Sequence, residues 1–210
     1  MNLFGVIVLL FIVIAVVLFY RWYIKDQKEI VSEWDAGMEP KLIESDKLNL
    51  STSLHYTFSV WIYLKQWTPK NQNRVVFQRI RGTSPVNNVE MAKDDGKMGD
   101  DSVYFHMEFH KTKPTLSTYV QLSGGGVGEC HIDNIPVQRW VNVIASVQGQ
   151  VIDMYLDGKL HKHCEFKTAL AEISKDTSIY IFGGSPIEGK ISKLEYIKKD
   201  IRPQRAWEIY

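Results

Sequence analysis

Cysteine is scarce in this chain of 210 residues, where only Cys130 and Cys164 occur. Two cysteines are too few for a multi-disulfide scaffold or for a four-cysteine zinc site. They can form one bridge if the domain faces an oxidising compartment, or they can stay as unpaired thiols inside a packed domain. The sequence leaves both arrangements open.

An excess of charge of one sign is also missing. The chain has 25 Lys and Arg against 24 Asp and Glu, a formal net charge of +1, so composition gives no reason to expect a nucleic-acid partner. Aromatic residues make up 12% of the chain. Together with frequent β-branched residues, they favour strands over disorder.

Local catalytic motifs are absent as well. The glycine-rich segment 122–128 (LSGGGVG) lacks the lysine and Ser/Thr of a phosphate-binding loop, and we interpret it as a flexible connector. No G-x-S-x-G elbow occurs, although a Ser-His-Asp triad assembled from distant positions is not excluded. We therefore expect no enzyme and no cofactor.

What the chain does have is one long hydrophobic run from Leu3 to Tyr20, without charge or proline. Its length is about 27 Å as a helix, close to the hydrocarbon thickness of a bilayer. The interfacial positions after it hold basic and aromatic residues, namely Arg21, Trp22, Tyr23 and Lys25. A cleaved signal peptide is the competing interpretation, but no basic n-region and no A-x-A-like site support it. The sequence therefore predicts a single-pass anchor over residues 1–24, with the lipid bilayer as a partner.

The orientation of this anchor follows from the basic residues around it. Arg21, Lys25 and Lys28 follow the run, whereas only the α-amino group precedes it. The positive-inside rule then predicts a cytosolic C-terminal domain. The glycosylation sequon Asn49-Leu50-Ser51 matters only if that domain is lumenal or extracellular.

Two further regions follow the anchor. Residues 25–45 show no sustained period and contain Gly37 and Pro40, which predicts a stalk or linker. From residue 46 to 210 the dominant signal is the period of two that is typical of strands. It predicts nine strands, at 56–64, 74–80, 102–109, 116–122, 139–148, 151–156, 159–166, 178–182 and 190–198.

Turn signals indicate how some of these strands are joined. Gly149-Gln150 and Asp157-Gly158 are two-residue hairpin turns, which makes Arg139–Phe166 a three-stranded antiparallel meander. Pro203 can open a short C-terminal helix. The expected fold is all-β, an antiparallel two-sheet β-sandwich or jelly roll behind one transmembrane helix.

Four segments in this order resemble the laminin-G-like, concanavalin A-like lectin/glucanase domain. They are 56–64 (YTFSVWIYL), 140–143 (WVNV), 151–159 (VIDMYLDGK) and 189–208. The resemblance covers roughly residues 45–210 and implies a jelly-roll sandwich. The glucanase branch uses an E-x-D-x-x-E strand, which this chain lacks, so glycoside hydrolysis is not expected. An anchor joined directly to such a domain also resembles the layout of minor capsid proteins that large DNA viruses carry on an internal membrane.

Candidate ligand-binding residues lie mostly in loops. Asp94, Asp95, Asp100 and Asp101 crowd the loop 84–101, which either binds calcium or is simply a solvated acidic loop. Trp67 follows a strand and is our candidate for an exposed aromatic side chain, whereas we expect Trp61 and Trp140 inside the sandwich. His161 and His163 share one strand face, which suits either a metal site or an exposed sheet face.

The sequence thus supports two functional hypotheses. The first is a non-catalytic, membrane-anchored structural protein whose sandwich docks on a protein partner such as a viral capsid shell. The second is a membrane-tethered lectin with its domain in the lumen or outside the cell. A Cys130–Cys164 bridge or a glycan at Asn49 favours the second hypothesis, and free thiols favour the first.

Overall fold

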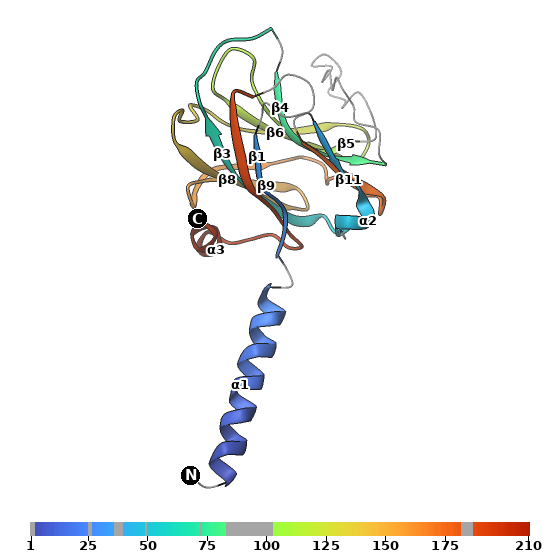
Figure 1. Ribbon diagram of the computed structural model, residues 1–210. Coiled ribbons are helices and arrows are strands. Elements are labelled where there is room, and N and C mark those ends of the chain that lie inside the picture. The colour runs from blue at the N-terminus through green and yellow to red at the C-terminus, as the bar shows by residue number, and fades with distance from the viewer. Residues whose placement is uncertain are drawn as a thin grey trace.

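Two antiparallel sheets packed face to face form the body of the protein (Figure 1). The computed structural model describes residues 3–24, 27–35, 40–48, 50–71, 73–82, 103–181 and 187–210. These residues confirm the predicted two-sheet antiparallel β-sandwich. The acidic loop with Asp94, Asp95, Asp100 and Asp101 lies outside them.

Each sheet has six strands, and both take strands from distant parts of the chain. The first sheet has the order β1 (Gln27–Asp35), β12 (Gly189–Ile197), β3 (His55–Leu64), β8 (Trp140–Gln148), β9 (Val151–Leu156) and β10 (Lys159–Glu165). The second sheet has the order β2 (Lys41–Ile43), β11 (Thr177–Ile181), β4 (Arg74–Arg81), β5 (Val103–Phe109), β6 (Leu116–Gln121) and β7 (Val127–Ile132). The described residues also form three helices, namely α1 (Leu3–Ile24), α2 (Ser45–Leu48) and α3 (Pro203–Ile209).

The core lies between the sheets and is built by the alternation seen in the sequence. In β3 the even-numbered apolar residues from Phe58 to Leu64 are at most 1% exposed. The neighbouring strand β8 buries Val141, Val143, Ala145 and Val147 in the same cluster. Since both strands alternate in phase, with Phe58 opposite Ala145, one face of the sheet is apolar throughout. The predicted Asp157-Gly158 turn is confirmed, with φ of 49° and 74°.

A disulfide joins the two sheets at one edge. Cys130 in β7 and Cys164 in β10 are bonded, with their Cα atoms 5.8 Å apart. β7 ends the order of the second sheet and β10 ends that of the first, so the bridge closes the sandwich on this side. Of the two arrangements that the sequence left open, the structure has the bridge. Such a bridge typically stabilises a fold by about 2–4 kcal/mol.

The interpretation of residues 25–45 as a stalk is wrong for most of that segment. Residues Gln27–Asp35 form β1, which pairs with β12, and Lys41–Ile43 form β2, which pairs with β11. A bulge in β1 shifts the register between Glu29 and Val31. The bulge interrupts the period of two that would have revealed a strand, and the charged residues around it are typical of an edge strand.

The interpretation of 122–128 as a connector is also wrong at its end. The turn closes by Gly126, and β7 begins at Val127. A Cβ atom built on Gly128 would lie 2.7 Å from the Phe166 ring. Gly128 is therefore a strand residue at a close approach between the sheets, and not a flexible link.

The helix α1 runs away from the sandwich (Figure 1) and exposes its large apolar side chains from Val6 to Phe19. Over the part of the chain that the structure describes, no helix is both long enough and apolar enough to cross a membrane. The α1 backbone includes Arg21, Trp22 and Tyr23, but their side chains, like the whole of Lys25, lie outside the described part. Their interfacial role stays a prediction.

Several tyrosines sit in the sandwich with their hydroxyl groups withdrawn from water. Burial raises their pKa above the usual 10.0 at Tyr56, Tyr119, Tyr155, Tyr180 and Tyr196. For Tyr155 burial raises the pKa to about 12, and the charges of Asp153 and Asp200 add to the effect. The folded state therefore favours neutral phenols.

These shifts predict a loss of stability at high pH. Below pH 10 the phenols are neutral in both states, and the free energy of unfolding keeps its full value. As the pH rises from 10 towards 12, the unfolded chain ionises first and the free energy of unfolding falls. Urea titrations of the full chain in detergent at several pH values measure this fall. Tyr155→Phe should reduce it, and an identical fall in that variant would contradict the assignment to Tyr155.

Candidate binding surface

The outer face of the first sheet carries the short helix α3. Ala206 and Ile209 of this helix pack on Ile144 and Tyr155 in a small cluster separate from the main core. Pro203 at the start of the helix supplies the fixed φ that its first turn needs. The sequence prediction of a helix here is confirmed, and the structure adds that the helix covers part of a sheet face.

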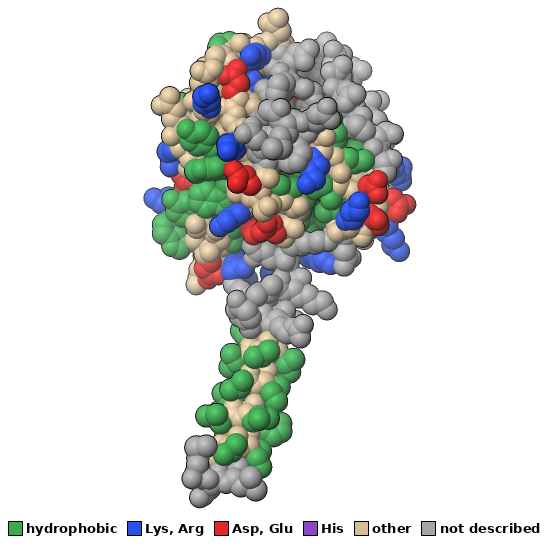
Figure 2. Space-filling view, viewed as in Figure 1, with side chains coloured by type: hydrophobic (Ala, Val, Ile, Leu, Met, Phe, Trp, Pro, Cys, Tyr) green, Lys and Arg blue, Asp and Glu red, His purple; other side chains and the backbone are tan. Residues whose placement is uncertain are grey.

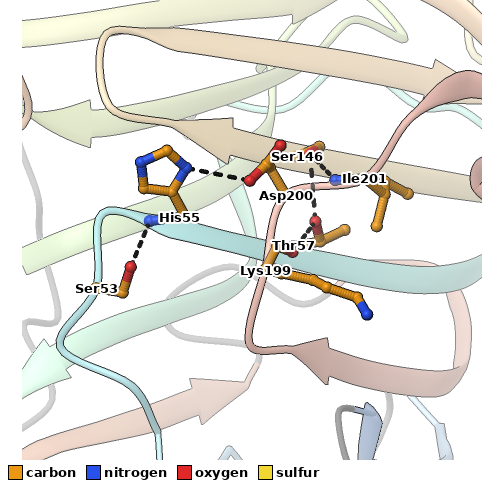
Figure 3. Close-up of polar contacts among 7 residues, drawn as sticks. All are labelled: Ser53, His55, Thr57, Ser146, Lys199, Asp200 and Ile201. Atoms are coloured by element: carbon orange, nitrogen blue, oxygen red, sulfur yellow. Dashed lines mark hydrogen bonds and ion pairs between the residues drawn. The ribbon is translucent and has the colours of Figure 1, made fainter. Parts of the chain in front are cut away.

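A polar network fastens the connection from β12 to α3 onto the sheet (Figure 3). Ser146 Oγ accepts from the Ile201 N–H at 2.9 Å and lies 3.2 Å from Thr57 Oγ1. Thr57 in turn donates to the Lys199 carbonyl at 2.9 Å. These bonds satisfy buried backbone groups of the connection, so they hold α3 in a fixed place.

The same network contains a histidine and an aspartate, but it is not a catalytic triad. His55 Nδ1 lies 3.1 Å from Asp200 Oδ1, as in the base–orienter half of a triad. The Ser53 hydroxyl accepts from the His55 backbone N–H, while Ser146 bonds to the connection. None of the hydroxyls drawn in Figure 3 bonds to the second imidazole nitrogen, so these seven residues do not form a Ser-His-Asp triad.

The outer face of the second sheet also has a row of polar groups. His106 lies 3.0 Å from Gln78 Nε2 on one side and 2.9 Å from Glu108 Oε2 on the other. Asn73 donates to the second oxygen of Glu108 at 2.7 Å. His106 is 0% exposed and Glu108 4%. A ligand in solution cannot reach these groups, and we assign them a structural role.

Accessible aromatic side chains instead gather around α3. We call the following five the aromatic surface: Trp61, Tyr63, Trp140, Trp207 and Tyr210. Tyr210 stacks on Trp61 and contacts Trp207, and Tyr63 contacts Trp140, each pair with ring centroids 5.6 Å apart. Trp207 is 55% exposed, Tyr210 47% and Trp140 38%. Figure 2 shows hydrophobic side chains gathered on this side of the domain, where the chain ends.

The turn between β9 and β10 sets the position of the Trp207 ring. Gly158, at φ +74°, has no side chain, and a Cβ built there would lie 3.0 Å from the Trp207 ring. The preceding Asp157 is held by the Asn142 N–H at 2.9 Å and by Arg139 at 2.8 Å. The Asp157-Gly158 turn, which is the strongest hairpin signal in the sequence, is thus also the turn on which the exposed Trp207 indole packs.

A cavity of about 390 Å³ opens between this turn and α3. Its size lies within the range of small-molecule sites in proteins. Seven residues line it: Leu156, Asp157, Lys159, Leu160, His161, Trp207 and Tyr210. The lining combines the aromatic side chains of Trp207 and Tyr210 with the polar side chains of Asp157, Lys159 and His161, so flat apolar faces and polar groups border the same space.

The position of this surface relative to α1 follows from strand register. α1 ends at Ile24 and β1 begins at Gln27, which pairs with Ile197. Tyr63 of the aromatic surface pairs with Lys190. Along β12, Lys190 is about 23 Å from Ile197. Tyr63 and its partner Trp140 therefore lie towards the end of the first sheet that is remote from α1. The helix α3, which carries Trp207, lies at the end of the sandwich nearer α1 (Figure 1), and its Ala206 packs with Ile197.

The predicted site residue Trp67 has a different environment. Its half-buried ring contacts Phe109 at 5.7 Å, and the Arg74 guanidinium lies 4.2 Å from its centroid. The indole N–H donates to the Thr112 carbonyl at 3.3 Å. Trp67 thus has its ring engaged within the fold, and it is not part of the aromatic surface.

The expected positions of two other tryptophans are wrong. Trp61 and Trp140 do not pack inside the sandwich, because odd-numbered residues of β3 and their partners in β8 face outwards. The sequence analysis did not single out Tyr210. A signal for the surface existed, since Trp61 and Tyr63 alternate with the core residues of β3.

The histidines of β10 do not assemble a metal site in the described chain. His163 Nδ1 lies 2.6 Å from Asp153 Oδ1, and His161 lines the cavity. No group of three His, Cys, Asp or Glu side chains among the described residues could hold a metal ion. The calcium hypothesis concerns the acidic loop and is not tested by the described residues.

Comparison with known proteins gives a fold and no family. No protein-family model and no curated protein matches the chain. Among solved structures, the receptor-binding domain of botulinum neurotoxin D matches with a TM-score of 0.61 and 10% identity over 88% of this chain and 47% of that one. The ligand-binding domain of serotype D in complex with N-acetylneuraminic acid matches with a TM-score of 0.55 and 11% identity, over 87% and 50%.

These likenesses support the sandwich and nothing finer. The chain spans less than half the length of the first three neurotoxin domains, 41% to 47%. Identities of 10–12% show a shared fold alone. The laminin-G-like and virion-protein resemblances continue to rest on the sequence.

The packing of Trp207 on Gly158 can be tested with a matched control variant. Gly158→Ala strains a positive φ and pushes against Trp207, whereas Gly149→Ala strains a φ of +60° with nothing within 4 Å. We expect each variant to lose about 1 kcal/mol of stability in urea unfolding. Only Gly158→Ala should also change tryptophan fluorescence and its quenching by acrylamide. The same spectrum in both variants would contradict the packing of Trp207 on this turn.

Proposed function

We propose that this chain is a non-catalytic, membrane-anchored binding module that holds its sandwich on the oxidising side of a membrane and binds a glycan through the aromatic surface. The observation that carries the proposal is the exposure of aromatic rings beside a cavity. Trp207 and Tyr210 are 55% and 47% exposed, and both line the cavity beside α3. Flat apolar faces and polar groups are therefore accessible together at one place on the sandwich.

The membrane anchor in this proposal is α1. The backbone of its 22 residues is about 33 Å long, compared with roughly 30 Å for the hydrocarbon layer. The described side chains cover only residues 5–19, about 22 Å, which is shorter than that layer. Within them, the large apolar side chains from Val6 to Phe19 are 38% to 67% exposed. An apolar surface of this extent is unfavourable in water and favourable in lipid.

The side of the membrane is argued from the disulfide. Disulfides such as Cys130–Cys164 persist in oxidising compartments and are rare in the cytosol. The positive-inside rule points the other way, but it rests on three basic side chains that follow the helix. We give the bridge more weight because it joins the two sheets of the fold. The proposed location is therefore the lumen or the cell exterior.

The ligand class is argued from the aromatic surface. An aromatic ring offers a flat apolar face, which suits the C–H face of a sugar, while the polar groups beside it can bond to hydroxyls. Trp207 and Tyr210 line the cavity together with Asp157, Lys159 and His161. This combination of exposed rings and convergent polar groups supports a glycan.

A protein partner is the second candidate. Exposed aromatic side chains are also enriched at protein interfaces, and an anchor joined to a sandwich is the layout that suggested a capsid shell. This version predicts that the same surface is covered by protein in the native assembly. Binding of glycans by the isolated chain separates the two candidates.

The orientation is tested by synthesis of the full chain on microsomes. A lumenal domain should gain a glycan at Asn49, seen as a mass shift that Asn49→Gln abolishes. Its cysteines should react with a maleimide polymer only after reduction, because the bridge protects them. An unshifted chain whose cysteines react without reductant would place the domain in the cytosol and overturn this part of the proposal.

Glycan binding is tested with the full chain in lipid nanodiscs on an array of neutral and acidic glycans. We expect selective binding, which Trp207→Ala weakens about tenfold, equivalent to about 1.4 kcal/mol. His131→Ala is the control, because His131 lies on the second sheet with an exposed side chain. An array without any bound glycan, from a chain shown to be folded, would refute the glycan and leave the protein partner.

A further inference from the structure

The charges around the cavity beside α3 are unevenly matched. Asp157 is the acidic residue that lines it, and its carboxylate already accepts hydrogen bonds from Arg139 at 2.8 Å and from the Asn142 N–H at 2.9 Å. Its charge is therefore largely balanced within the protein. Lys159 and His161 line the same cavity from β10.

The other acidic groups near the cavity also have basic partners. Asp153 of β9 lies 2.6 Å from His163 Nδ1, and Glu208 of α3 lies 3.0 Å from Arg205. Glu165 stands at the opposite end of β10, about 20 Å from Lys159. Among the described side chains that line the cavity, the charge of Asp157 is therefore balanced by Arg139, and Lys159 supplies a further positive charge.

Lys159 is placed to act on a bound group. It follows Gly158 directly, so its side chain starts beside the turn on which Trp207 packs. The Lys159 residue is exposed, which leaves its ammonium group accessible to an anion. Lys159, Trp207 and Tyr210 line the same cavity, so a ring stacked on either aromatic side chain would share that cavity with the lysine.

We infer that this cavity binds an anionic sugar residue, with the sugar ring against Trp207 and Tyr210 and its acidic group beside Lys159 and His161. The inference rests on the proposed glycan-binding function and narrows its ligand class. Both a carboxylate and a sulfate supply the required negative charge. The shared chemistry is an acidic group carried on a pyranose ring.

The test compares three trisaccharide or smaller probes on the full chain in lipid nanodiscs, namely lactose, sialyllactose and sulfated lactose. Wild-type protein should bind at least one acidic probe about tenfold or more tightly than lactose. Raising the salt from about 50 to about 300 mM should shrink this difference, because salt screens exposed charge. Lys159→Glu should abolish this preference, measured as the ratio of the affinities for the acidic probe and for lactose in the same variant.

Lys113→Glu is the matched control. Lys113 is exposed in the hairpin between β5 and β6, on the second sheet, and the same charge reversal there should leave all three affinities unchanged. Comparing sialyllactose with sulfated lactose then identifies which acidic group the cavity accepts.

The outcomes separate this inference from the proposed function. Equal binding of lactose and both acidic probes, lost in Trp207→Ala, would keep the glycan-binding function and overturn the anionic ligand. If Lys159→Glu still binds an acidic probe more tightly than lactose, Lys159 does not bind the acidic group, and the proposed site is wrong. If the folded chain binds none of the three probes and no glycan on the array, both the proposed glycan-binding function and this inference are wrong.

Discussion

The backbone pairing of β1 with β12 is the constraint that joins the N-terminal segment to the first sheet. It begins three residues after α1 and runs along the whole strand, from Gln27 opposite Ile197 to Asp35 opposite Lys190. This pairing fixes which end of the first sheet is next to the helix and which end is remote. Without β1, a flexible linker would connect α1 to the sandwich, and no surface of the sandwich would lie at a defined distance from the helix.

The strands that the sequence predicts are those where alternation and turn chemistry agree. In β8 and β9, apolar residues alternate, and the turns at the two ends of β9 carry glycines at positive φ. β1 lacks this agreement, since its bulge puts Ile30 and Val31 out of phase. The sequence does not predict β7 for another reason. Gly128 looks like part of a flexible connector, and only the structure shows that the Phe166 ring packs where its side chain would be.

The aromatic surface could be predicted only in part. Alternation in β3 places Trp61 and Tyr63 opposite the core, yet nothing local indicates that the C-terminal helix folds back over that face. That contact depends on Ile144 and Tyr155, which are apolar residues on the outward side of β8 and β9. Trp67 shows the reverse problem. Its position in a loop predicts an exposed ring, whereas in the structure Arg74 and Phe109 pack against that ring.

The small cluster under α3 has a consequence for how such a protein can change. Its members, among them Ile144, Ile201 and Ala206, do not belong to the main core between the sheets. The outer side of the helix can then acquire new side chains while the sandwich keeps its packing. Divergent copies of this chain could therefore change the exposed side of α3 through a few substitutions in a single helical turn, with the disulfide and the two sheets inherited intact.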